Sequence, residues 1–213
     1  MTTKLTLLTA LVVSSLLAFT QENDEPKMHT LFDSENTSIG GYGGLRIAYS
    51  NFNERDILMV GGRGGVIFNS SFVFGGAGYG IVNSPQFENV SFNNETYPTL
   101  FLQGGYGGVL FEYILKPNKV VHFTFPVVLG AGSVLFADKH PLHGGPNYNE
   151  HIITNSEFFV VEPGVEIELN VIQFMRIAVG ASYRLTSEID LPSMPTNSFN
   201  GLTTSISLKF GKF

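Results

Sequence analysis

Three glutamates that lie close together in the sequence, Glu162, Glu166 and Glu168, are the first residues that could do chemistry. They share one parity along an extended stretch, so their side chains would lie on one face of a strand. Paired carboxylates in that arrangement can act as general acid and general base. Basic residues elsewhere in the chain have the matching parity, however, and ion pairing explains the glutamates without catalysis. We therefore expect no enzymatic activity.

A histidine-rich stretch is the second candidate. His140, His143 and His151, with Glu150 beside the last, could bind a metal ion. The surrounding residues are polar and include glycine and proline, which is typical of a solvated loop. The three histidines are therefore weak candidates, and we expect neither a metal site nor a cofactor.

Glycine pairs flank a bulky residue in three repeats, GGYGG at 40–44, GGRGG at 61–65 and GGYGG at 104–108. Glycine-rich loops can bind phosphate, but neither nucleotide-binding spacing, GxGxxG or GxxxxGKS/T, occurs in the chain. An apolar run follows each repeat. The glycines therefore have to be understood from the elements that contain them.

Eight runs of strand-like composition follow residue 38, and their apolar and polar residues alternate, so each strand has one apolar and one polar face. A tilted strand needs about 9–11 residues to cross a bilayer, and most of the runs are that long. The runs are 38–50, 57–69, 72–83, 99–115, 120–137, 158–171, 174–186 and 202–210.

Short and long connections alternate strictly between these runs. The longer ones are 52–56, 84–98, 138–157 and 187–201. Transmembrane barrels have short periplasmic turns and longer external loops. The sequence therefore predicts an all-β fold over residues 38–213, an eight-stranded antiparallel up-and-down transmembrane β-barrel with both termini on the periplasmic side.

If the apolar residues face lipid, the glycine repeats turn small and large residues alternately toward the interior. An eight-stranded barrel is only wide enough for side chains to fill it, and small barrels often alternate small and large residues there. We interpret the glycines as making room for the bulky residue between them. The inward residues of the repeats, besides Arg63, are Gly40, Tyr42, Gly44, Gly61, Gly65, Gly104, Tyr106 and Gly108.

The same parity places charged residues of both signs inside the barrel. Buried charges are tolerated only when they are paired and hydrogen-bonded. Because the signs nearly cancel, we predict a network of ion pairs that fills the lumen. Its members are Arg46, Arg63, Glu112, Glu162, Glu166, Glu168, Arg176, Arg184 and Lys209.

The N-terminal stretch is typical of an export signal. Lys4 precedes an apolar stretch, and Ala18 and Thr20 suit a cleavage site before Gln21. We predict a cleaved signal peptide over 1–20 and an N-terminal periplasmic segment over 21–37. The chain has no cysteine, which excludes disulfides, and its net charge of −6 argues against a nucleic-acid partner.

The C-terminal stretch SISLKFGKF ends in Phe213. A terminal aromatic residue on an alternating last strand resembles the signal that the outer-membrane barrel assembly machinery recognises. Ile206, Leu208 and Phe210 have outward parity, whereas Phe213 has the opposite one. Either a bulge at Gly211 restores the phase, or Phe210 acts as the signal.

With this C-terminus, the glycine-rich segments VGGRGGVIFNSSFVFGGAGYG and LQGGYGGVLFEY make the chain resemble small outer-membrane β-barrel proteins of Bacteroidota-type bacteria. It also resembles the eight-stranded barrels of the OmpA/OmpX type. The resemblance implies the outer membrane of a Gram-negative cell, contact with outer-membrane lipid, and insertion by the barrel assembly machinery.

We expect a structural or surface-interaction role, exerted through the extracellular loops on an extracellular partner of unknown identity. One alternative is a small conduit for a hydrophobic or ionic solute across the outer membrane. The other is a soluble secreted calycin-like barrel that binds a small ligand. The calycin-like alternative inverts the two faces of the wall and places the glutamates and arginines in water.

Overall fold

The computed structural model describes residues 38–138 and 152–213, which form antiparallel β-strands joined by turns and one longer segment. The predicted signal peptide and N-terminal segment lie outside these residues. The described part of the chain contains no helix long and apolar enough to span a membrane. The strands are β1 (Ile39–Phe52), β2 (Arg55–Phe68), β3 (Phe72–Ile81), β4 (Gln86–Phe92), β5 (Glu95–Leu115), β6 (Val121–Ala137), β7 (Ile152–Ile172), β8 (Met175–Thr186) and β9 (Gly201–Lys212).

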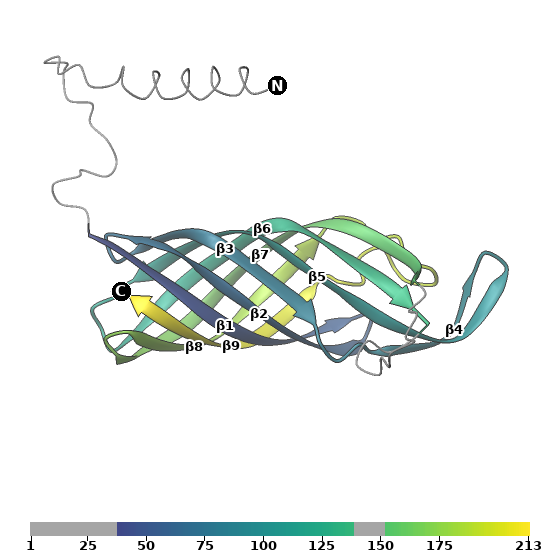
Figure 1. Ribbon diagram of the computed structural model, residues 1–213, viewed down its shortest axis with the longest axis horizontal. Coiled ribbons are helices and arrows are strands. Elements are labelled where there is room, and N and C mark those ends of the chain that lie inside the picture. Colours follow the sequence, from purple (N-terminus) through teal and green to yellow (C-terminus); the bar gives the residue numbers. More distant parts are fainter. Residues whose placement is uncertain (1–37, 139–151) are drawn as a thin grey trace, which may run out of the picture. The chain divides into compact units, whose positions relative to one another are not determined.

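Eight of these strands close into a ring. Starting at β1, the ring runs through β2, β3, β5, β6, β7, β8 and β9, and β9 pairs with β1 again. All pairings are antiparallel, and the strands cross the wall obliquely (Figure 1). The predicted eight-stranded up-and-down barrel is therefore confirmed. Strand β4 pairs only with the first part of β5, and this β4–β5 hairpin projects beyond the wall.

The predicted strict alternation of short and long connections is wrong. Strands β1 and β2 are joined by a two-residue turn, Asn53 and Glu54, whose φ angles of 44° and 64° are those of a tight hairpin. Most of 84–98 is the β4–β5 hairpin, and β7 already begins at Ile152. Polar residues here extend the strands past the wall, because antiparallel pairing satisfies their backbone groups. Among the described residues, only 187–200 is a long connection without strands.

The barrel has two unlike ends. We call the end with connections 69–71, 116–120 and 173–174 the turn end; β1 starts there and β9 finishes there. The opposite end, with the β1–β2 turn, the β4–β5 hairpin and residues 187–200, is the loop end.

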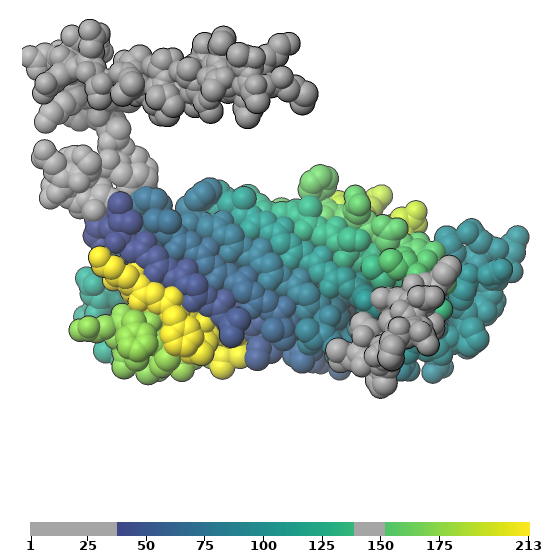
Figure 2. Space-filling view, viewed as in Figure 1, coloured from purple at the N-terminus to yellow at the C-terminus, as the bar shows by residue number. Residues whose placement is uncertain are grey.

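The outer face of the wall is apolar and the inner face carries the charges. On β1, the side chain of Leu45 is 63% exposed, whereas its neighbour Arg46 is only 4% exposed. The same alternation continues around the ring, and Figure 2 shows the strands as continuous oblique bands on one face of the wall. Exposed residues on this surface include Ile47, Phe74, Phe111, Phe123, Phe125, Val165, Ile167, Val179 and Ile206.

The room for the inward tyrosines comes from the neighbouring strand, which differs from the reason inferred from the sequence. Directly opposed residues of an antiparallel pair share a face. Gly132 lies opposite Tyr106 and Gly211 opposite Tyr42. A Cβ atom added at Gly132 would overlap the carbonyl oxygen of Gly105 and lie 2.6 Å from the Tyr106 Cβ and 2.8 Å from the Phe158 Cζ. At the flanking glycine Gly44 the nearest atoms to an added Cβ are all backbone atoms, with the carbonyl oxygen of Leu208 at 2.7 Å.

The substitution Gly132→Ala tests this close packing. Because the added methyl group would overlap the Gly105 carbonyl oxygen, Tyr106 and Phe158, we expect it to lower the free energy of unfolding by about 1–3 kcal/mol. Gly43→Ala is the matched control, because nothing lies within 4 Å of its added Cβ, and we expect a change within about 0.5 kcal/mol. Urea titration of the folded barrel measures both. Equal costs would contradict this account of the glycines.

Candidate functional site: the barrel interior

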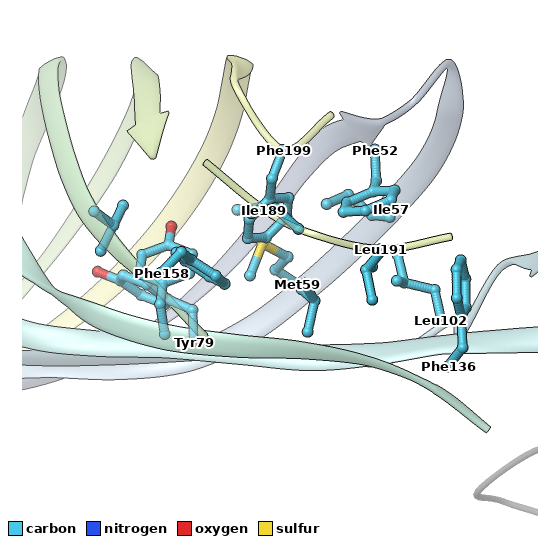
Figure 3. Packing of buried hydrophobic residues seen from close by; sticks show 14 of the residues in the cluster. Phe52, Ile57, Met59, Tyr79, Leu102, Phe136, Phe158, Ile189, Leu191 and Phe199 are labelled. Atoms are coloured by element: carbon cyan, nitrogen blue, oxygen red, sulfur yellow. The ribbon is translucent and has the colours of Figure 1, made fainter. Parts of the chain in front are cut away.

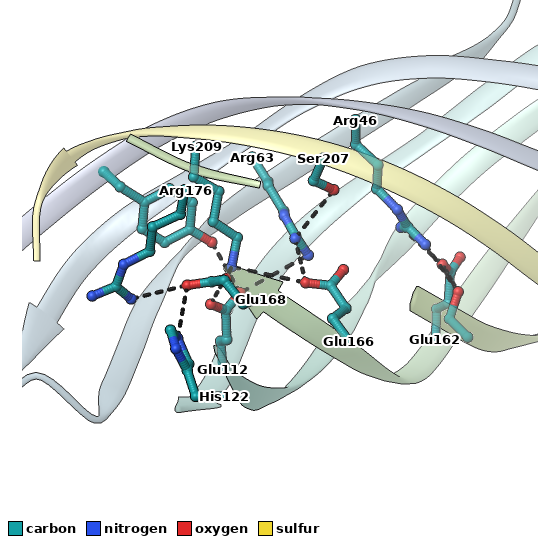
Figure 4. Close-up of polar contacts among 12 residues, drawn as sticks. Arg46, Arg63, Glu112, His122, Glu162, Glu166, Glu168, Arg176, Ser207 and Lys209 are labelled. Atoms are coloured by element: carbon teal, nitrogen blue, oxygen red, sulfur yellow. Dashed lines mark hydrogen bonds and ion pairs between the residues drawn. The ribbon is translucent and has the colours of Figure 1, made fainter. Parts of the chain in front are cut away.

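Two zones divide the interior of the barrel. The zone toward the turn end holds a charged network contributed by seven ring strands (Figure 4). The zone toward the loop end is packed with apolar side chains (Figure 3). The structure places all nine residues of the predicted charge network inside, each at most 5% exposed.

Lys209 on β9 is the centre of the larger charged group. Its Nζ lies 2.7 Å from Glu112 Oε1, 2.5 Å from Glu168 Oε2 and 3.8 Å from Glu166 Oε2. These carboxylates come from β5 and β7, on other parts of the ring. One ammonium group therefore connects three carboxylates across the interior.

Further donors complete the Lys209 group. Arg63 Nη2 donates to Glu166 at 2.6 Å and to Ser207 Oγ at 3.3 Å. Arg176 Nη1 donates to Glu168 at 2.9 Å, and the His122 ring nitrogen Nε2 lies 3.2 Å from the same oxygen. Tyr42 donates its hydroxyl to Glu112 at 2.9 Å.

The second charged group centres on Glu162. Arg46 Nη1 donates to its Oε1 at 3.0 Å, and the Ser182 hydroxyl donates to the same oxygen at 2.6 Å. The Tyr106 hydroxyl donates to the other carboxylate oxygen. The Arg46 guanidinium also lies over the Tyr79 ring, 4.9 Å from its centroid. Glu162 therefore has three donors from three strands.

The alternating pleat explains why these groups meet. Glu162, Glu166 and Glu168 occupy inward positions of one strand, β7, and their partners occupy inward positions of other strands. Gly180 lies directly opposite Glu166, and its lack of a side chain leaves space for the glutamate, since an added Cβ would lie 2.5 Å from the Glu166 Cγ. Every carboxylate of the network has a cation within 3.0 Å. Such paired charges favour a filled interior over a catalytic site.

Residues 187–200 fold back into the loop end, and we call this segment the plug. Ile189, Leu191 and Phe199 of the plug are almost completely buried. They pack against wall residues that include Phe52, Ile57, Met59, Leu102, Phe136 and Phe158 (Figure 3). The plug was not predicted. Four apolar residues in this connection, Ile189, Leu191, Met194 and Phe199, were the signal in the sequence that could have indicated it.

Arg184 is the predicted network member that the structure separates from the others. Its guanidinium is fully buried among the apolar zone and the plug. Nε donates to the carbonyl oxygen of Phe199 at 2.8 Å, and Nη2 donates to Ser50 Oγ at 2.9 Å. The parity assignment placed this residue inside but could not indicate which contacts it makes.

The two C-terminal aromatic residues lie on opposite faces. Phe210 is exposed on the outer wall, whereas Phe213 packs against Tyr42 and Arg176 at the turn end. The Arg176 guanidinium carbon lies 3.8 Å from the Phe213 ring centroid. Pairing between β1 and β9 continues through Gly211 without a register shift, so the bulge considered there is absent.

No cluster of three or more histidine or acidic side chains arranged to hold a metal occurs among residues 38–138 and 152–213. The weak metal candidates His140, His143 and His151 lie outside the described residues.

Comparison with known proteins gives similarities to solved barrels only. No family model matches the chain, and no curated protein matches its sequence. Neisserial surface protein A is 13% identical with a TM-score of 0.48, over 83% of this chain and 99% of that one. The N-terminal β-barrel domain of Pseudomonas aeruginosa OprF is 6% identical with a TM-score of 0.43, over 80% and 96%. Ail, the attachment invasion locus protein of Yersinia pestis, is 11% identical with a TM-score of 0.42, over 81% and 97%.

Lys209→Met tests the role of the central ammonium. The substitution leaves Glu112 and Glu168 buried without their nearest cation, so we expect a loss of about 3–5 kcal/mol in the free energy of unfolding. Lys212→Met, on the same strand but exposed, should change it by less than about 0.5 kcal/mol. Denaturant titrations of both variants measure the difference. A Lys209 variant as stable as the Lys212 variant would show that the network is not stabilising.

Proposed function

We propose that the chain is an outer-membrane β-barrel with a closed interior and a non-enzymatic role, and that it acts through the surface of its loop end. The observation that carries the proposal is the arrangement of its two faces, with apolar side chains around the outside and charged side chains sealed within. In this proposal the chain is exported by a cleaved signal peptide, and the turn end lies in the periplasm.

The outer wall supports the membrane location. Soluble monomers rarely expose contiguous apolar patches larger than a few hundred Å². Here exposed apolar side chains occur on every ring strand, and they include Tyr49, Tyr113 and Tyr183 as candidates for the interfacial girdles. A closed ring also satisfies backbone groups within the wall, as lipid requires. The calycin-like alternative needs the charged residues in water, whereas the structure buries them.

The filled interior supports a closed barrel over a conduit. The Lys209 group occupies the turn half of the interior, and the plug with its apolar packing occupies the loop half. A solute would have to break several ion pairs and also displace the plug. We therefore keep the conduit as the second candidate and favour a structural or surface role.

The loop end supports interaction with an extracellular partner. It carries the projecting β4–β5 hairpin, and among the described residues its exposed charges are strongly acidic. The exposed acidic residues there are Glu54, Asp56, Glu88, Glu95, Asp138, Glu157, Glu188 and Asp190, with Arg55 as an exposed basic residue. Such a surface attracts cationic groups and repels nucleic acid. The described turn end instead exposes Lys116, Lys119 and Lys212.

The remaining partners follow from the proposed location. Outer-membrane lipid would contact the apolar wall. The barrel assembly machinery would recognise the last strand through Phe210, which is exposed on the outer wall; Phe213 packs inward at the turn end and is less accessible.

A charge placed at two depths of the wall tests the membrane location. Val179 lies midway along β8 and is 58% exposed, whereas Leu202 lies near the loop end of β9. In lipid, Val179→Arg should cost about 2–4 kcal/mol and Leu202→Arg about 0–1 kcal/mol. Unfolding in liposomes measures both. Near-zero costs at both positions would indicate a wall that faces water.

Conductance in a planar lipid bilayer tests the closed interior. Because ion pairs and the plug fill the barrel, we expect no stepwise conductance from the folded protein. Insertion is checked separately by the mobility shift that folded barrels show on gels before and after heating. A conductance that changes on Arg63→Gln or Glu166→Gln would favour the conduit and overturn the closed-barrel proposal.

A further inference from the structure

Arg184 differs from the other four interior cations in having no carboxylate partner among the described residues. Arg46, Arg63, Arg176 and Lys209 each contact a glutamate. The network therefore holds five cations and four carboxylates, and Arg184 is the cation left over. Glu162 interacts with Arg184 electrostatically but forms no ion pair with it. A fully buried charge without an ion-pair partner is costly, so its surroundings require an explanation.

The contacts of Arg184 are all with neutral groups. Nη1 lies 3.3 Å from the Met59 sulfur, and Nη2 donates to Ser50 Oγ at 2.9 Å. Nε donates to the backbone carbonyl of Phe199 in the plug, and Nη2 also lies 3.5 Å from the carbonyl oxygen of Asn51. The guanidinium carbon lies 5.7 Å from the centroid of the Tyr106 ring. A carboxylate would bind a guanidinium more strongly than any of these acceptors, and could do so with two parallel hydrogen bonds.

The ring of Phe199 lies in an aromatic cage that belongs to the wall. Its centroid is 5.6 Å from that of Phe52, 5.3 Å from that of Phe158 and 6.2 Å from that of Tyr106. The Arg184 guanidinium carbon covers the ring at 3.7 Å from its centroid. Figure 3 shows Phe199 close to Ile189 and Met59, inside the apolar zone. The ring of Phe199 therefore fills the aromatic cage, and its carbonyl group accepts a hydrogen bond from Arg184.

The contacts that hold the plug can be lost without breaking the hydrogen bonds between the strands of the wall. No strand pairing involves residues 187–200. Its bonds to the wall include the Asn53 N–H to the Ser198 carbonyl and the Asp190 N–H to Ser156 Oγ, each at 2.9 Å. Segments with few backbone bonds to the rest of a protein open more readily than paired strands.

We propose that Arg184 and the aromatic cage form a binding site for an apolar organic anion, a molecule with a carboxylate on an aromatic or acyl body. The carboxylate binds the Arg184 guanidinium directly and supplies the ion pair that no described glutamate forms with it. The apolar body enters the cage of Phe52, Tyr106 and Phe158. Phe199 occupies this site when it is empty, and ligand binding displaces the plug toward the loop end.

The chemistry of the site selects this class of ligand. A neutral apolar molecule would fill the cage but leave Arg184 without an ion-pair partner, and a cation would be repelled. The other interior cations are already paired, so they do not compete for the anion. The Lys209 group fills the turn half of the interior, so the proposed ligand enters from the loop end by displacing the plug. Binding therefore goes beyond the proposed function without requiring transport.

Binding of 2-naphthoate, measured by ligand-observed NMR on the folded barrel in nanodiscs, tests the site. Arg184→Met should weaken binding at least about tenfold, because it removes a charge-assisted contact. Phe199→Ala should strengthen binding several-fold, because it removes the competing side chain. Arg55→Met, at an exposed arginine of the same end, is the control and should bind like the unchanged protein. Nanodiscs without the protein measure how much 2-naphthoate partitions into the lipid itself.

The neutral isostere 2-naphthamide separates charge recognition from apolar partition. It should bind the unchanged protein more weakly than 2-naphthoate and should be insensitive to Arg184→Met. Equal binding of 2-naphthoate to the Arg184→Met and unchanged proteins would overturn the proposal, as would absence of saturable binding to Phe199→Ala. If Arg184→Met fails to fold, the Phe199→Ala result and the comparison of the two ligands still decide.

Displacement of the plug has its own readout. The chain has no cysteine, so Ile189→Cys introduces a single thiol at a fully buried plug position. Addition of 2-naphthoate should raise its rate of reaction with a water-soluble maleimide several-fold, and 2-naphthamide should have little effect. If 2-naphthoate binds and the thiol stays protected, Phe199 is not displaced. That result would overturn the proposed displacement of the plug by the ligand.

Discussion

Closing eight strands into a ring leaves an interior so narrow that the wall must fill it with its own side chains. Every inward residue therefore has to fit the residues facing it, in volume and in charge. Gly132 leaves space for Tyr106, and Gly180 leaves space for Glu166. The charges follow the same constraint, because a glutamate that cannot reach water must reach a cation. Lys209 satisfies this requirement for two glutamates at once, with a third close by.

The two halves of the interior meet this constraint in different ways. Toward the turn end, ion pairs join strands that lie far apart in the sequence, so the network links the wall across its diameter. Toward the loop end, the strands supply apolar side chains, and the open end would leave them in water. The plug covers them with Ile189, Leu191 and Phe199. Arg184 lies within the apolar zone and donates to a backbone carbonyl of the plug, and the proposed ligand exchange takes place at this contact.

In the proposed function, the outer wall contacts lipid and the two ends of the barrel contact water. An apolar outer face around a sealed, charged interior is the reverse of a soluble barrel, and this inversion underlies the proposed membrane location. It leaves the two ends as the surfaces in contact with water. The loop end is the larger and more acidic of the two within the described residues, and it holds both the β4–β5 hairpin and the plug. Interaction with other molecules is accordingly proposed at that end.

Alternation with a period of two predicted the face on which each strand residue lies, and together with the lengths of the runs and their connections it predicted the class of fold. It placed Arg46, Glu166 and Lys209 inside from the sequence alone, because a strand side chain has only two directions available. Which charges meet depends on how the strands are staggered around the ring, and local sequence does not encode that stagger. The Lys209 group, the extension of β4 and β5 beyond the wall, and the inward fold of residues 187–200 were decided by tertiary structure. The Lys209 group and the inward fold of residues 187–200 each require a partner surface that exists only after the ring has closed, whereas the β4–β5 extension depends on pairing between two consecutive strands.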